Sequence, residues 1–85
     1  MPLRPRPNLT FAQDQDGAAI LDPSAGTITT LNETGAFVWR GLQDGRSEGQ
    51  MVTDLARVTG AEEPVVAEGV RAFLNEPRIA ALLEE

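Results

Sequence analysis

The chain has 85 residues, a formal net charge of −6 and no cysteine. A chain of this length forms one small domain with a modest core, and without cysteine it has no disulfide bond. No transmembrane run or signal peptide is visible, so we expect a cytoplasmic protein that does not enter a membrane.

The residue inventory excludes most catalytic chemistry. The sequence contains no His, Cys, Tyr or Lys, which rules out a Ser-His-Asp triad, a thiolate nucleophile, a Schiff base and the usual zinc sites. Paired carboxylates remain at Asp14/Asp16, in an expected turn, and at Glu62/Glu63, at an expected helix start. Paired acids act in catalysis only when they converge in a pocket. Solvated carboxylates are therefore the simpler interpretation, and we expect that the chain is not an enzyme.

The first third of the chain predicts an extended arm and three strands. Prolines at positions 2, 5 and 7 exclude a helix in residues 1–7 and disfavour a central strand there. Three segments of alternating or β-branched residues follow, separated by the turn signals Asp14-Gln15-Asp16-Gly17 and Asp22-Pro23-Ser24-Ala25-Gly26. The expected strands lie around Leu9 and Phe11, over 18–21 and over 27–31. Together they predict a three-stranded antiparallel meander.

Three helices are predicted after the sheet. Asn32 is a preferred N-cap for a helix over 33–42. Ser47 begins the second helix, Gln50 completes a capping box, and Gly60 suits the end. The third helix begins near Pro64 and is interrupted by Pro77, after which residues 79–83 add a short helical turn. The apolar faces of the three helices are expected to be Gly35, Val38, Trp39 and Leu42; Met51, Leu55 and Val58; and Val66, Val70, Phe73 and Leu74.

This order predicts an α+β fold that is winged-helix-like, with the sheet placed first. Residues 8–85 form the single domain that follows the arm of residues 1–7. The second and third helices are similar to a helix-turn-helix pair, which leaves a winged-helix transcription regulator as an alternative. The third helix argues against it, because Glu62, Glu63, Glu68 and Glu76 outnumber Arg71 and repel phosphates. We therefore expect no nucleic-acid partner.

The segment Leu31-Asn32-Glu33-Thr34-Gly35-Ala36, followed by Trp39, Leu42 and Asp44-Gly45, resembles the PqqD family. These proteins are precursor-peptide recognition elements of ribosomally made, modified peptides. The segment Val70-Arg71-Ala72-Phe73-Leu74 also fits the family pattern. The resemblance covers roughly residues 9–75, and it departs from the family at Asn75-Glu76-Pro77, where relatives continue the third helix.

The resemblance implies non-catalytic binding of the leader segment of a precursor peptide, with no cofactor and no metal. The leader adds as a further strand along the third strand, in a groove beside the third helix. The implied protein partner is a leader peptidase of the cysteine protease type, a macrocyclase or another modifying enzyme. The chain itself is expected to be a monomer or a dimer paired through the strand edge.

The peptide-binding residues are expected on the third strand and the third helix. They are Thr27, Ile28, Thr29, Thr30 and Leu31 on the strand, and Ala67, Val70, Arg71 and Leu74 on the helix. Helical spacing of i, i+4 and i+7 joins Ala67, Arg71 and Leu74. We expect Ala67 to make room, Leu74 to contact an apolar leader residue and Arg71 to pair with a leader acid. The alternative for Arg71 is an ordinary solvated charge.

Two features leave alternatives open. Gly69 lies inside the third helix, where it either allows close approach to another backbone or is simply tolerated. The short free-standing chain with its Pro/Arg-rich start is similar to the leader-binding proteins of lasso-peptide biosynthesis. The alternative is a PqqD-type chaperone for a radical-enzyme pathway such as pyrroloquinoline quinone biosynthesis.

Overall fold

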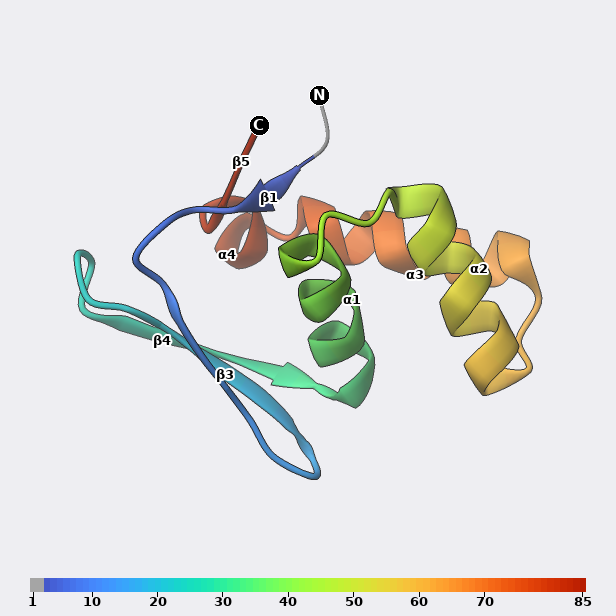
Figure 1. The fold of residues 1–85 in the computed structure, drawn as a ribbon, viewed down its shortest axis with the longest axis horizontal. Coiled ribbons are helices and arrows are strands. Elements are labelled where there is room, and N and C mark those ends of the chain that lie inside the picture. Colours follow the sequence, from blue (N-terminus) through green and yellow to red (C-terminus); the bar gives the residue numbers. More distant parts are fainter. Residues whose placement is uncertain (1–2) are drawn as a thin grey trace.

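A computed structural model describes residues 3–85 and has the expected α+β architecture. A three-stranded sheet comes first, and three long helices and one short helix follow (Figure 1). A separate pair of very short strands joins the two ends of the described chain. The elements are β1 (Arg4–Pro5), β2 (Thr10–Gln13), β3 (Gly17–Asp22), β4 (Thr27–Asn32), α1 (Glu33–Gln43), α2 (Glu48–Thr59), α3 (Glu63–Asn75), α4 (Pro77–Ala80) and β5 (Leu83–Glu84).

The main sheet is an antiparallel meander in the order β2-β3-β4. Its first turn is held by the Asp14 carboxylate, which accepts hydrogen bonds from the backbone N–H groups of Asp16 and Gly17 at 2.8 and 3.0 Å. Burial alternates along the strands, as expected for a sheet with one covered face. Ile20 and Leu31 are buried against the helices, whereas Ile28 on the other face is 67% exposed.

The helix boundaries follow the predicted caps. The Asn32 side chain accepts a hydrogen bond from the Gly35 N–H at 2.8 Å and fixes the start of α1. The Ser47 hydroxyl accepts one from the Gln50 N–H at 3.1 Å, and Gly60 ends α2 in the left-handed conformation with φ of 77°. Each cap satisfies a backbone group that the helix leaves unpaired, which is worth about 1 kcal/mol.

The core lies between the covered face of the sheet and the helices. Trp39 of α1 is fully buried at its centre, as the sequence predicts. Gly35 favours the approach of the Phe73 side chain to the start of α1, because a Cβ there would lie 3.1 Å from the Phe73 ring and 3.3 Å from the Leu31 Cβ. The glycine thus lets the third helix approach the junction of β4 and α1.

The sequence prediction of the buried face of α2 is partly wrong. Val58 was expected in the buried face of α2 but is 68% exposed, and Val52 and Ala56 are buried instead, together with Met51 and Leu55. Since a helix turns about 100° per residue, Val58 lies roughly 90° from the centre of that stripe.

The expected terminal helix over 79–83 is also displaced. Helix α4 begins earlier, at Pro77, and the chain leaves it to form β5. Leu82 and Leu83 are nevertheless buried.

The two ends of the described chain are fastened to each other (Figure 1). Strand β1 pairs with β5, and the Arg6 N–H donates to the Leu82 carbonyl at 2.9 Å. The Arg6 side chain also donates to the Ala81 carbonyl at 2.9 Å and to the Asp22 carboxylate at 2.8 Å. The predicted arm is therefore extended but packed on the domain, except for residues 1–2, which lie outside the described residues.

The Arg6 contact also sets the charge state of a buried acid. Asp22 is 5% exposed. Its pKa is lowered from 3.8, first because the Arg6 guanidinium donates to it, and also because the Ser24 and Ala25 N–H groups do. Burial opposes this shift without reversing it.

Within residues 3–85, no helix has both the length and the apolar character needed to cross a bilayer.

Candidate functional site

The outer edge of β4 carries unpaired backbone groups. No strand formed by residues 3–85 pairs with this edge, because β4 is the last strand of the sheet. In an antiparallel pair, residues alternate between those that bond to the neighbouring strand and those that point away from it. The Thr30 carbonyl accepts a hydrogen bond from Arg78 at 2.8 Å. The Thr30 carbonyl therefore faces the open edge, and the backbone groups of Ile28, two residues away, face the same edge.

An apolar cavity of about 360 Å³ lies beside the end of β4. It opens between the start of α1, the end of α2 and the side of α3 that carries Val66 and Val70. Most of its wall is apolar, with the polar groups at the strand–helix junction and at the end of α2. The lining residues are Asn32, Thr34, Gly35, Val38, Leu55, Thr59, Ala61, Val66, Gly69, Val70 and Phe73. A cavity with this lining suits an apolar side chain.

Helix α3 supplies Val66, Gly69, Val70 and Phe73 to this wall. Gly69 does not bring α3 close to another backbone, because no atom of another segment within residues 3–85 lies within 4 Å of the position that a Cβ would take. The missing side chain instead leaves open space at the cavity wall. Of the two interpretations of Gly69 from the sequence, the close approach is therefore not what the structure shows.

The five strand residues predicted to bind peptide divide between two environments. Leu31 is buried and Thr29 is half-buried, and both face the helices. Thr27, Ile28 and Thr30 are exposed. Only Ile28 and Thr30 combine exposure with backbone groups that the strand alternation directs to the open edge.

The four predicted helix residues do not lie together. Val70 lines the apolar cavity, whereas Leu74 lines a different cavity beside Met51. Ala67 is half-buried against the core, and Arg71 is exposed. Arg71 is two residues from both Gly69 and Phe73, so it lies on nearly the opposite side of α3. The face through Ala67, Arg71 and Leu74 is therefore not the face that lines the cavity.

Sequence reasoning missed three residues of this region. Phe73 was assigned to the core only, yet it forms part of the cavity wall. Gly69 gave a usable signal, since a glycine in a helix interior is unfavourable without a local reason. Arg78 gave none, because its contact with Thr30 joins residues 48 positions apart.

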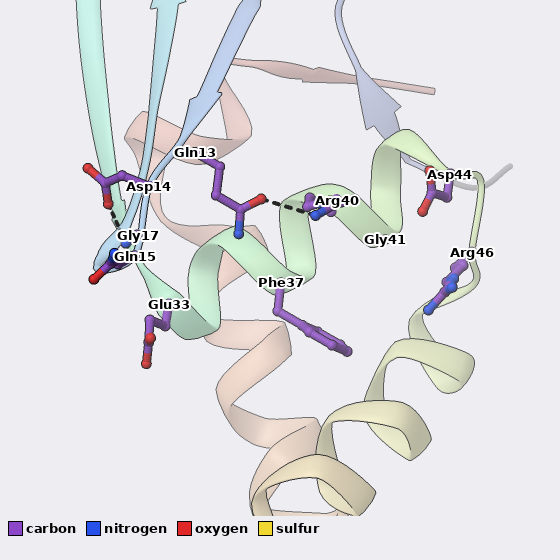
Figure 2. Close-up of a pocket in the computed structure, with 10 residues that line it drawn as sticks. All are labelled: Gln13, Asp14, Gln15, Gly17, Glu33, Phe37, Arg40, Gly41, Asp44 and Arg46. Atoms are coloured by element: carbon purple, nitrogen blue, oxygen red, sulfur yellow. Dashed lines mark hydrogen bonds between the residues drawn. The ribbon is translucent and has the colours of Figure 1, made fainter.

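A second cavity, of about 320 Å³, lies where α1 faces the turn between β2 and β3 (Figure 2). Figure 2 shows Arg40 reaching across from α1 to Gln13, with 3.2 Å between the guanidinium and the amide oxygen. Several of its charged groups are already engaged: Asp14 holds the turn, and Arg46 pairs with Asp54 at 3.0 Å. Arg40, Asp14 and Arg46 therefore already serve contacts within the fold.

The sheet-first arrangement, with helices packed on one face of the meander, defines a winged-helix-like α+β domain. A family model described as coenzyme PQQ synthesis protein D (PqqD) matches residues 17–83. The chain belongs to the PqqD family, as the sequence resemblance indicated. No curated protein matches the chain significantly.

Two solved structures share this fold over nearly the whole chain. One is described as TbiB1 in complex with the TbiA(beta) leader peptide; it has a TM-score of 0.85 and 23% identity, and the match covers 95% of this chain and 94% of that one. The other is a lasso peptide synthetase B1 complexed with the leader peptide. It has a TM-score of 0.86 and 24% identity, with both chains covered completely.

Proposed function

We propose that this chain binds the leader segment of a ribosomally made precursor peptide and presents it to a modifying enzyme or a leader protease. One observation carries the proposal: β4 has an open edge among the described residues, and the strand ends at Asn32, which lines an apolar cavity. An edge strand without a partner is an aggregation hazard unless another chain uses it. Both structural neighbours are complexes with leader peptides, which supports the same assignment.

The binding mode follows from the alternation of strand residues. The N–H and C=O groups of Ile28 and Thr30 pair with the incoming strand, which supplies affinity without regard to sequence. Side chains of that strand alternate between two faces. One apolar side chain enters the cavity next to Gly69 and Phe73 and supplies selectivity.

The other edge of the sheet is a weaker candidate. Strand β2 has four residues and β4 has six, so β4 offers the longer ladder. The apolar cavity borders the end of β4 through Asn32. The residues of β2 border a polar cavity and a shallow space near the first turn, and the shallow space is also lined by Thr30 and Leu31 of β4.

The pathway is proposed to be of the lasso-peptide type, because one structural neighbour is described as a lasso peptide synthetase B1. The partner would then be a cysteine protease that removes the leader, followed by a macrocyclase. The family description, coenzyme PQQ synthesis, favours the alternative of a chaperone for a radical-enzyme pathway. In both cases the recognition domain acts without catalysis or cofactor, and the chemistry belongs to the partner.

Filling the cavity tests this function with a matched control. Gly69→Leu places a side chain at the cavity wall, whereas Gly49→Leu adds the same side chain to an exposed position of α2; neither Cβ meets an atom within 4 Å. Both variants should fold, with stability unchanged or raised by up to about 1 kcal/mol. Isothermal titration with the leader of a precursor encoded beside this gene should give micromolar to nanomolar affinity, about −8 to −12 kcal/mol.

We expect Gly69→Leu to lose at least about tenfold in affinity, which corresponds to about 1.4 kcal/mol. Gly49→Leu should bind like the wild type. Equal affinities of the two variants would exclude the cavity as part of the site, and absence of binding by the wild type would overturn the proposed function itself.

A further inference from the structure

Arg78 lies on the open edge that the peptide needs. Its guanidinium reaches from α4 to the Thr30 carbonyl at 2.8 Å. A strand that pairs with β4 at this position would donate its own N–H to the same carbonyl oxygen. In the absence of peptide, Arg78 therefore occupies a hydrogen-bonding position of the incoming strand, and its charge protects the edge against pairing with another copy.

The guanidinium is held weakly enough to be displaced. Its side chain is 50% exposed, and its other charged contact is Glu76 at 3.6 Å, itself 42% exposed. Ion pairs with such exposure contribute little. Arginine carries five N–H donors in a planar fork, so contacts with Thr30 and Glu76 leave donors available for a further acceptor.

We propose that Arg78 selects an acidic residue in the bound peptide. The inference rests on the proposed strand addition to β4. The incoming strand replaces Arg78 at the Thr30 carbonyl, and the displaced guanidinium stays at the edge, next to the strand that replaced it. A carboxylate on that strand is the partner that a planar guanidinium fork fits best, through two parallel hydrogen bonds. The peptide must also outcompete Glu76 for this cation.

The position of Arg71 makes it the weaker candidate for the same role. It lies on the side of α3 away from Gly69 and Phe73, which line the cavity. Arg78, in contrast, already contacts the edge of β4. The two arginines therefore provide a matched comparison between the residue that the sequence indicated and the residue that the structure indicates.

A display experiment tests this selectivity without knowledge of the natural leader. A library of short random peptides is selected in parallel on the wild type, Arg78→Gln, Arg78→Glu and Arg71→Gln. We expect Asp or Glu to be enriched at one position of the peptides selected on the wild type and on Arg71→Gln. The enrichment should disappear on Arg78→Gln and change to Lys or Arg on Arg78→Glu.

Matched peptides give the quantitative test. A selected peptide and its Glu→Gln counterpart should differ in affinity for the wild type by up to about fivefold. On Arg78→Gln the ratio of the two affinities should fall to about one, because no guanidinium remains to pair with the carboxylate of the acidic peptide. The neutral peptide should lose no affinity. An acid preference that survives in Arg78→Gln but vanishes in Arg71→Gln would overturn the inference in favour of Arg71.

Peptides that bind the wild type without any charge preference would overturn this inference alone. If no selected peptide bound at the β4 edge, the proposed function would fail together with it.

Discussion

At the residue scale, the two helical glycines Gly35 and Gly69 have opposite physical roles. A Cβ at Gly35 would lie 3.1 Å from the Phe73 ring and 3.3 Å from the Leu31 Cβ, so a side chain there would force these neighbours to shift by a few tenths of an ångström. At Gly69, no other segment of the described chain comes within 4 Å of the Cβ position, and the residue lines a cavity. The first role could be predicted, because Gly35 follows a strand and a cap in the chain. The second could not, because open space around a helix depends on elements distant in sequence.

Asp22 gives the clearest pH dependence. Its pKa lies below 3.8 in the folded chain because Arg6 donates to its carboxylate. A folded-state pKa below the unfolded value stabilises the fold above the unfolded pKa, and the contribution is lost as the pH falls through the folded value. We predict that the free energy of unfolding of the wild type decreases more steeply than that of Asp22→Asn between about pH 5 and pH 2.

Urea unfolding across this pH range measures the difference between the two proteins. Asp14→Asn is a useful comparison, because Asp14 also accepts backbone hydrogen bonds but has no arginine partner. Parallel pH profiles of wild type and Asp22→Asn would show that the contact with Arg6 does not set the pKa of Asp22.

At the element scale, the alternation of β4 decides which backbone groups are available. Thr29 is paired with Ile20 and faces β3, whereas Thr30 faces the open edge. The simple sequence expectation that all of Thr27 to Thr30 offer backbone bonds to a peptide therefore applies to only half of them. Strand alternation could be predicted from the sequence, but which set faces outward depends on the register with β3.

Two proline substitutions separate the inner and outer groups. We predict that Thr30→Pro folds, since proline is tolerated on an edge strand where the lost N–H points away from the sheet. It should lose at least about tenfold in peptide affinity, because a donor is missing and the ring obstructs the incoming strand. Thr29→Pro should unfold or lose about 1–3 kcal/mol, because the carbonyl of its partner in β3 loses its donor.

Circular dichroism shows whether each proline variant is folded, and titration with the leader peptide measures its affinity. A folded Thr30→Pro variant with wild-type affinity would exclude strand addition at the centre of β4. A fully stable Thr29→Pro variant would mean that the alternation is reversed.

The element boundaries were predictable because local chemistry determines them. Asn32, Ser47 and Gly60 each cap a helix through contacts within three or four residues. Val58 was wrongly assigned to the buried face of α2, because helical spacing indicates where an apolar stripe lies but not how wide its buried part is. The face of α3 through Ala67, Arg71 and Leu74, which the sequence indicated for peptide binding, is not the face that lines the cavity. Helical periodicity identifies one apolar stripe but does not show which element lies against each side of it.

At the scale of the whole molecule, the features that the sequence did not predict are contacts between residues that lie far apart in the chain. Arg6 joins the start of the described chain to the last residue of β3 and to the segment before β5. Arg78 joins α4 to the edge of β4. Both contacts are made by single polar side chains on residues that lie far apart in sequence, where no periodic pattern exists. The order of strands and helices, in contrast, follows from periodicity and turn residues along the chain, and the family resemblance agreed with it.

Strand addition at the β4 edge is the central step of the proposed binding, and amide hydrogen exchange measured by NMR tests it directly. In the free protein, the Thr29 and Leu31 amides should be protected, since they face β3, while Ile28 and Thr30 exchange faster. Addition of a bound leader peptide, or of a peptide selected from the library, should slow exchange at Ile28 and Thr30. Slowed exchange at Phe11 and Gln13 of β2 instead, or no change along either edge of the sheet, would contradict the account.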